Sequence, residues 1–296
     1  MQNIDISIIE WLQKLSNGFL DLFFKVVTFF GDQIIFILVG VLIYWLYNKR
    51  AAFKLVFGYL IGGLLVGTLK VIVARPRPYT FSNIESIGSE THGFSFPSGH
   101  SQASGSLFYG LKNIFRQRWL FYTLIAILIL VPLSRMYLGQ HFLTDVLAGS
   151  IIGILGAMLA FKVVDLMKEK EHIYSLYLVP IFLVALIVLL ILEGNATNSV
   201  EFYDKFQDLF KMIGAFIAFS IGYAIEKVYV KHEVEASPKA KVLKVLVGLI
   251  PLALIYFGLS AIMPKTGIMT TLRYAIVVIW AILGAPFVFT KLIKNR

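Results

Sequence analysis

The feature that most constrains this chain is a succession of long apolar stretches that are separated by short polar segments. A helix needs about 20 predominantly apolar residues to cross the hydrocarbon core of a bilayer. Hydrophobic residues make up 58% of the 296 residues and charged residues 15%, whereas soluble domains have about 45–50% and about 25%. The chain is therefore expected to be an integral membrane protein and not a soluble or disordered one.

Nine of the apolar stretches are predicted to be the membrane spans of an all-α, polytopic helical bundle. They cover residues 32–47, 52–74, 100–115, 119–138, 143–166, 173–193, 208–228, 242–263 and 272–291. Ahead of them, residues 1–31 carry apolar side chains at helical spacing, among them Ile8, Ile9, Leu12 and Leu15. This pattern predicts amphipathic helices that lie at the membrane interface.

The distribution of charge indicates an orientation and a kind of partner. The net charge is +10, with 27 Lys and Arg residues against 17 Asp and Glu residues. Most of the basic residues fall in alternate loops, which predicts an extracytoplasmic N-terminus and a cytoplasmic C-terminus. Basic loops also suit anionic lipid headgroups, and without a basic-aromatic binding module we expect no nucleic-acid partner. His172 and His232 fall in cytoplasmic loops and are expected to be solvated.

Three groups of polar residues lie at the ends of apolar stretches. They are residues 70–78 after the second stretch, residues 94–101 at the start of the third, and residues 134–145 between the fourth and fifth. The alternation of spans places all three groups on the extracytoplasmic face. Because ionisable residues at membrane depth are costly, they are functional candidates by default, and their convergence predicts one composite site.

The charges and glycines of these groups favour phosphate as the ligand. Lys70, Arg77 and Arg135 are three fixed cations, and no equal set of nearby carboxylates neutralises them. Arginine offers a bidentate fork to phosphate oxygens. Ser98 and Gly99 directly precede a helical stretch, where the free N–H groups and the helix dipole favour an anion and a glycine lets the backbone come close.

Two histidines and one aspartate can supply the chemistry. His141 and Asp145 are four residues apart, so on a helix they lie on one face. Asp145 can then accept a hydrogen bond from one ring nitrogen of His141 and leave the other nitrogen as a nucleophile. His100 is available as a general acid for the leaving oxygen. A metal site is the alternative use of these residues, but the surrounding cations repel divalent ions, so we expect no metal and no cofactor.

At these residues the chain resembles the type 2 phosphatidic acid phosphatase family of integral membrane lipid phosphatases. The family pattern is Lys, six residues, Arg-Pro; then Pro-Ser-Gly-His; then Ser-Arg, five residues, His, three residues, Asp. Every fixed position is filled here at the right spacing. The matching residues are Lys70, Arg77, Pro78, Pro97, Ser98, Gly99, His100, Ser134, Arg135, His141 and Asp145.

The resemblance implies a metal-independent phosphohydrolase. By analogy, His141 attacks phosphorus and forms a phosphohistidine, Asp145 supports it, and His100 protonates the leaving group. The residues that hold the phosphate by the same analogy are Lys70, Arg77, Ser98, Gly99 and Arg135, with Arg75 as an auxiliary residue. The resemblance covers a catalytic core (20–168) and a C-terminal transmembrane extension of unknown role (170–296). With the amphipathic interfacial helices (1–31), these are the predicted parts of the chain.

The predicted function is hydrolysis of a lipid phosphate or diphosphate that reaches an extracytoplasmic site in the cell membrane from the bilayer. The candidate substrates are undecaprenyl diphosphate, which we favour, phosphatidylglycerophosphate and phosphatidic acid. Two alternatives come from other classes of protein. One is a lipid or phosphate transporter, although transporters bind near the midplane of the membrane. The other is a catalytically silent lipid-binding protein, although such a protein would be free to lose His141 or His100.

Overall fold

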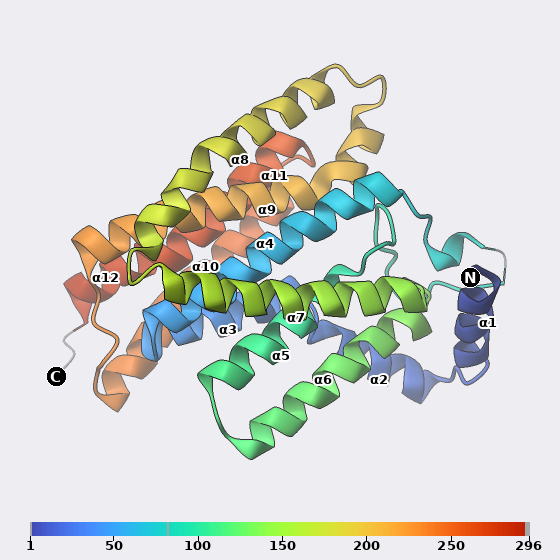
Figure 1. Cartoon of the computed structure of the whole chain (residues 1–296), viewed down its shortest axis with the longest axis horizontal. Coiled ribbons are helices and arrows are strands. Elements are labelled where there is room, and N and C mark those ends of the chain that lie inside the picture. Colours follow the sequence, from blue (N-terminus) through green and yellow to red (C-terminus); the bar gives the residue numbers. More distant parts are fainter. Residues whose placement is uncertain (1, 82, 294–296) are drawn as a thin grey trace. The chain divides into compact units, whose positions relative to one another are not determined.

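The computed structural model describes residues 2–81 and 83–293, and over these residues the chain contains helices and no strand (Figure 1). The helices are α1 (Gln2–Gln13), α2 (Gly18–Phe29), α3 (Gln33–Leu46), α4 (Lys49–Val73), α5 (Gly99–Ile114), α6 (Arg118–Tyr137), α7 (Leu143–Leu166), α8 (Glu171–Gly194), α9 (Ser199–Ile225), α10 (Pro238–Ile262), α11 (Gly267–Ile279) and α12 (Ala285–Leu292). Three short helical segments complete them: η1 (Pro78–Thr80), η2 (Glu226–Val230) and η3 (Trp280–Gly284). The two chain ends, whose sides of the membrane we predicted, include residues 1 and 294–296, which lie outside the described residues.

The predicted all-α, multi-pass membrane fold is confirmed, and the number of nine spans stays a prediction. Within the described residues, seven helices are long and apolar enough to cross a membrane, or eight if the bent pair α2 and α3 forms one span. All nine predicted stretches are helical, yet α3 has 14 residues and α5 has 16. A 16-residue helix is about 24 Å long, which is less than the hydrocarbon thickness of about 30 Å.

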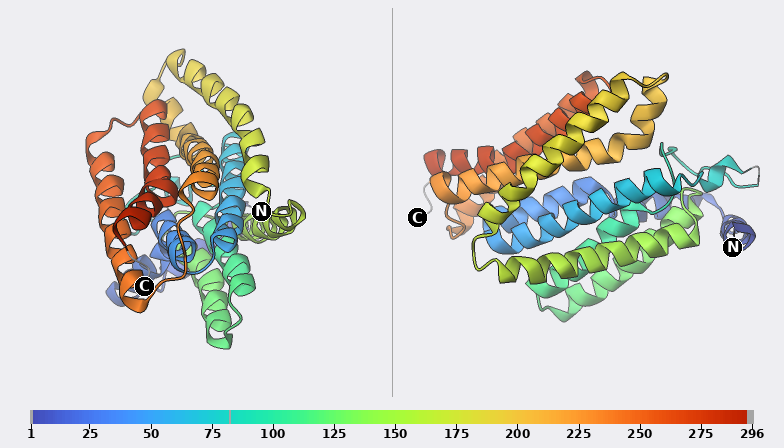
Figure 2. Two further views of the ribbon diagram at one scale, coloured as in Figure 1. Left: turned by 90° about the vertical axis from the view of Figure 1, so that its left-hand side faces the viewer. Right: turned by 45° about the horizontal axis from the view of Figure 1, so that its top comes forward.

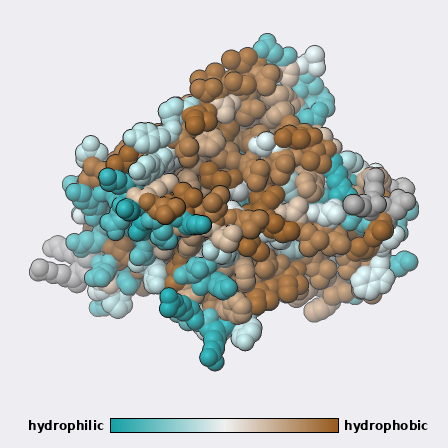
Figure 3. Space-filling view, in the orientation of Figure 1, coloured by the Kyte–Doolittle hydropathy of each residue, from teal (hydrophilic) through white to brown (hydrophobic). Residues whose placement is uncertain are grey.

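Apolar side chains cover the outside of the long helices, as Figure 3 shows for one face of the molecule. Examples on α7 and α8 are Leu147, Ile151, Leu155, Ile181, Val184 and Ile187, each at least half exposed. Soluble monomers rarely expose large contiguous apolar patches. This surface is therefore suited to lipid.

The chain forms two compact units. The first comprises Met1–Leu38 and Lys54–Phe161, and the second comprises Val39–Phe53 and Lys162–Arg296. The unit boundaries fall within α3, α4 and α7. The division that we predicted at residues 168–170 stays a prediction.

In the first unit, small residues bring α5 and α7 into close contact. A Cβ atom added to Gly105 on α5 would lie 2.5 Å from the carbonyl oxygen of Ser150 on α7. A Cβ atom on Gly149 would collide with the carbonyl oxygen of Ser98. Glycine at these positions therefore permits a separation that larger residues would prevent, and it holds the start of α5 against the first turns of α7.

The two N-terminal helices pack against the end of α6 and the turn that follows it. Ile9 and Leu12 of α1 and Phe24 of α2 are buried in one apolar cluster with Tyr137 and Phe142. Figure 1 and the right-hand view of Figure 2 show α1 close to the loop that follows α4, where Gln13 bonds with the backbone of Glu85. The N-terminal segment is therefore helical, as predicted, and its position at the membrane interface stays a prediction.

In the second unit, α9 packs against α8 and α11, and a buried polar cluster surrounds the start of η2. The Glu226 carboxylate accepts hydrogen bonds from Tyr44 Oη at 2.8 Å, Lys49 Nζ at 2.7 Å and His232 Nδ1 at 2.7 Å. His232 is only 2% exposed, so the expectation that it is solvated is wrong. The reason is that the chain after η2 folds back and donates the His232 backbone N–H to the same carboxylate at 2.9 Å.

Candidate active site

The predicted site residues of the first unit meet where four helices end or begin. Helices α4 and α6 end at this place, and α5 and α7 begin there. Lys70 lies in the last turn of α4, Arg135 in the last turn of α6 and Asp145 in the first turn of α7. The structure therefore brings the three sequence groups together, as the alternation of helices predicted.

Most of these side chains are buried although they are charged or polar. The buried residues are Lys70, Arg77, Ser98, Arg135, His141 and Asp145, and Gly99 and His100 are partly exposed. Burying a charge is costly unless it is paired and hydrogen-bonded. The hydrogen-bond partners of each buried cation therefore indicate which of its donors remain available for an anionic ligand.

Arg135 is held by one hydrogen bond and has two free donors. Its Nη1 donates to Thr28 Oγ1 of α2 at 3.1 Å. Its Nε and Nη2 atoms are buried and have no hydrogen-bond partner among the described residues. An anion with several oxygens, such as phosphate, would satisfy both donors.

Arg77 is fixed by backbone carbonyls of the loop between α4 and α5. Its Nε donates to Gly93 at 2.9 Å and its Nη2 donates to His92 at 3.0 Å. Its Nη1 donates to the carbonyl of Gln140 at 3.1 Å and lies 3.3 Å from His141 Nε2. The guanidinium is thereby held beside one ring nitrogen of His141.

The histidine–aspartate pair has a different geometry from the one predicted. His141 Nδ1 lies 3.7 Å from Asp145 Oδ2, which is too long for a hydrogen bond. The helical spacing does not apply because α7 begins at Leu143 and His141 precedes it. Asp145 Oδ2 instead accepts the backbone N–H of Phe142 at 2.9 Å. The carboxylate faces Nδ1 nonetheless, and Nε2 faces the cations.

The environment of His141 favours its neutral form. Burial lowers the pKa of this imidazole well below 6.5, and the positive charges of Arg77, Arg135 and Lys70 lower the pKa further. A neutral imidazole has a lone pair on one nitrogen. At neutral pH, His141 can therefore act as a nucleophile or base without first losing a proton.

The start of α5 is capped by a serine side chain and borders open space at the next residue. Ser98 is the N-cap residue, and its Oγ accepts the backbone N–H of Ser101 at 3.4 Å and the Ser101 hydroxyl at 3.0 Å. A Cβ atom added to Gly99 would meet nothing within 4 Å. His100 follows in the first turn. The N-terminal amides of α5 thus border a space that an anion could occupy.

The sequence reasoning missed one carboxylate, which the predicted auxiliary arginine connects to Asp145. Arg75 was predicted to be an auxiliary residue, and its Nη1 donates to Asp145 Oδ1 at 2.8 Å while its Nη2 donates to Asp5 Oδ2 at 2.8 Å. Asp5 comes from α1 and was not predicted to be part of the site. A single carboxylate in an amphipathic segment carries no motif, so no sequence signal could have identified it.

Fold and site together define a class: a polytopic, all-α membrane protein with a buried cationic site that suits phosphate. Comparison with known families is more specific. Residues 51–168 match the PAP2 superfamily, and residues 210–296 match the PAP2 superfamily phosphatase transmembrane extension. Over 154 residues the chain is 31% identical to phosphatidylglycerophosphatase B of Bacillus subtilis (strain 168), covering 49% of this chain and 71% of that relative. The chain belongs to the PAP2 superfamily.

Other relatives are similar over shorter parts of their length. The chain is 29% identical over 109 residues to undecaprenyl-diphosphatase BcrC of Bacillus subtilis (strain 168), covering 36% of this chain and 55% of that relative. The chain therefore spans about half the length of this relative. The crystal structure of Aquifex aeolicus LpxE aligns with a TM-score of 0.49 and 22% identity, covering 53% of this chain and 93% of that one.

Proposed function

We propose that this protein is a metal-independent lipid phosphate phosphohydrolase. The observation that supports this best is the environment of His141 Nε2, which lies 3.3 Å from Arg77 Nη1. In the same site, two buried donors of Arg135 have no partner among the residues that the structure describes. A nucleophile beside unpaired cationic donors is the arrangement that phosphoryl transfer requires, because catalysis of this reaction consists largely of positioning and charge stabilisation.

The first step transfers the phosphoryl group to the protein. His141 Nε2 attacks phosphorus, the N–P bond forms, and the bond between phosphorus and the leaving oxygen breaks. Burial and the neighbouring cations lower the pKa of His100, but the negative charge of a bound phosphate raises it again, so that His100 takes up a proton when the substrate binds and donates it to that oxygen. As the imidazole becomes positive, its Nδ1–H donates to Asp145 and closes the 3.7 Å separation, since catalytic hydrogen bonds are often long before the substrate binds.

The second step restores the protein. His100, now neutral, accepts a proton from water, and the water oxygen attacks the phosphohistidine. The N–P bond breaks, inorganic phosphate leaves, and His141 returns to its neutral form. Lys70, Arg77 and Arg135 stabilise the phosphoryl oxygens in both steps, and Ser98 and Gly99 provide the helix start that borders them.

We favour undecaprenyl diphosphate as the substrate, with phosphatidylglycerophosphate and phosphatidic acid as the other candidates. The site lies at helix ends rather than in the middle of the long helices, so a headgroup at the membrane boundary could enter it while the chains stay in the bilayer. We place this boundary on the extracytoplasmic side. The same location at helix ends disfavours the transporter alternative.

Phosphate release in detergent, with EDTA present, tests this proposal. We would compare the wild type, His141→Ala and the control His92→Ala, because His92 lies in the neighbouring loop and is exposed. The panel would contain the three candidate lipids. Release by the wild type and by His92→Ala, with loss in His141→Ala, is the expected result. No release from any lipid by folded protein would refute the phosphatase, and release that survives His141→Ala would refute the nucleophile.

A further inference from the structure

The N-terminal helix α1 places a carboxylate beside the proposed catalytic pair. Asp5 is only 4% exposed. Its Oδ2 atom lies 2.8 Å from Arg75 Nη2 and accepts the hydroxyl of Thr144 at 3.1 Å. A buried carboxylate is costly unless it is paired and hydrogen-bonded, and Asp5 meets both conditions with residues that flank the site.

Arg75 connects Asp5 to the catalytic carboxylate. Its Nη1 donates to Asp145 Oδ1 at 2.8 Å and to Thr144 Oγ1 at 2.6 Å. Its guanidinium carbon lies 3.9 Å from the centre of the Phe142 ring. The planar fork of arginine suits this arrangement, because one guanidinium can bind two carboxylates in fixed directions.

Asp145 is therefore oriented on both of its oxygens. Arg75 holds Oδ1, and the backbone N–H of Phe142 holds Oδ2 at 2.9 Å, on the side that faces His141 Nδ1. Contacts run continuously from Asp5 through Arg75 and Asp145 to His141. Groups that orient a reacting residue's partner typically affect activity about 10- to 100-fold in metal sites.

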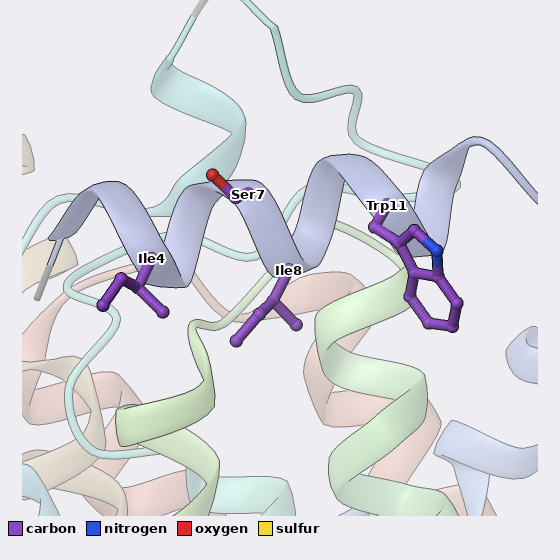
Figure 4. Close-up of a pocket in the computed structure, with 4 residues that line it drawn as sticks. All are labelled: Ile4, Ser7, Ile8 and Trp11. Atoms are coloured by element: carbon purple, nitrogen blue, oxygen red, sulfur yellow. The ribbon is translucent and has the colours of Figure 1, made fainter.

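Helix α1 is itself held firmly in place. Ile9 and Leu12 are buried in the apolar cluster of the first unit, and Gln13 Nε2 donates to the carbonyls of Glu85 at 2.8 Å and Tyr137 at 3.1 Å. Ile4, Ile8 and Trp11 follow one another along the helix and line an open pocket with Ser7 (Figure 4). With this anchoring, α1 can fix the position of Asp5.

We propose that Asp5 is a positioning residue for the phosphatase reaction, which acts by holding Arg75 against Asp145. The inference rests on the proposed function. In the native structure, Arg75 pairs with two carboxylates, those of Asp5 and Asp145. Without Asp5, the Arg75 guanidinium loses one of the two carboxylates that fix its direction, and the orientation of Asp145 toward His141 then depends mainly on the Phe142 backbone N–H.

The test compares Asp5→Asn and Asp5→Ala with the control Glu10→Gln. Glu10 is another carboxylate of α1, and it accepts a hydrogen bond from Asn83 Nδ2 at 3.2 Å, away from the site. We expect kcat to fall about 10- to 100-fold in both Asp5 variants, with KM within about twofold of the wild type because no contact with the substrate is removed. Glu10→Gln should keep the wild-type kcat.

The pH profile separates positioning from a merely structural role. Removing the negative charge of Asp5 makes the site more positive, which lowers the pKa of His141 and moves the acid limb of kcat/KM to lower pH. Loosening of the fold would admit water and move the limb up toward 6.5. The charged and titratable groups around His141 are Lys70, Arg75, Arg77, His100, Arg135 and Asp145.

The outcomes distinguish this inference from the proposed function. Wild-type turnover that His141→Ala abolishes supports the phosphatase whatever the Asp5 variants do. The inference is overturned if both Asp5 variants, folded as judged by their melting temperature, keep kcat within about twofold of the wild type. It is also overturned if kcat falls only together with a lower melting temperature and an acid limb that moves upward.

Discussion

Arg135 allows a test of phosphate binding in which activity and stability change in opposite directions. Its Nε and Nη2 atoms are buried without a partner among the described residues, while Nη1 binds Thr28. An unsatisfied buried donor costs about 1–3 kcal/mol, and more when it is charged. We therefore expect Arg135→Met, an apolar replacement of similar length, to raise the free energy of unfolding by about 1–3 kcal/mol in the absence of substrate.

The cost to activity follows from the same two donors. Each hydrogen bond between Arg135 and a bound phosphate is worth about 1.5–3 kcal/mol, because both partners are charged. Arg135→Lys keeps the charge and loses the planar fork. We expect kcat/KM to fall about 10- to 200-fold when one bond is lost, as in Arg135→Lys, and about 10²- to 10⁴-fold when both are lost, as in Arg135→Met.

The assay pairs denaturant unfolding in detergent with the kinetics of phosphate release. Arg273→Met is the control, because the half-buried Arg273 side chain donates an exposed hydrogen bond to Ser260 at 3.2 Å in the second unit. The reasoning is refuted if Arg135→Met is less stable than the wild type, since the arginine would then be a structural residue. Full activity of Arg135→Lys would refute the use of its fork for phosphate.

Three further predictions follow from burial, pairing and packing. The acid limb of kcat/KM should lie below pH 6.5 in a pH profile, because the pKa of His141 is lowered and the imidazole stays neutral as the pH falls through 6.5. Glu226→Ala should lower the free energy of unfolding by about 3–5 kcal/mol in denaturant titrations, because it leaves buried partners unpaired. The control Glu201→Ala breaks an exposed pair and should leave the unfolding midpoint close to that of the wild type. Gly105→Ala should lower the free energy of unfolding by about 1–3 kcal/mol in denaturant titrations, because its Cβ atom would lie 2.5 Å from a carbonyl oxygen of α7. Its control Gly99→Ala should leave the melting temperature unchanged, because a Cβ atom there meets nothing within 4 Å, and should raise KM by narrowing the open space at the start of α5.

The sequence patterns were sufficient to predict the helices and to predict that the three groups of polar residues meet in one site. The apolar stretches predicted every long helix, because in lipid each backbone polar group must be satisfied within its own segment. The alternation of helices then placed Lys70, Ser98, Arg135 and Asp145 at neighbouring helix ends. The same patterns did not determine the number of membrane spans, because the length of a stretch such as α5 does not say whether its ends reach both sides of the bilayer.

Two features of individual side chains could not be predicted from the sequence patterns: the relation of His141 to Asp145 and the burial of His232. Whether His141 lies on the same helix face as Asp145 was decided by the turn before α7, where Gly139 adopts a φ of +71°. The burial of His232 was decided by a chain reversal after η2. Both are local backbone choices that hydrophobic periodicity does not encode.

By itself, the sequence determined that this is a multi-pass helical membrane protein whose charged motifs meet at one set of helix ends. Spacing along a helix and the cost of charge in lipid are enough for that. Only the tertiary structure decided which groups touch. It brought Asp5 of α1 to Arg75, left two donors of Arg135 without a partner in the described part of the chain, and set His141 Nδ1 3.7 Å from Asp145 Oδ2. The physical reason is that contacts between distant segments depend on how packed helices meet in three dimensions, and no periodicity within one segment records that.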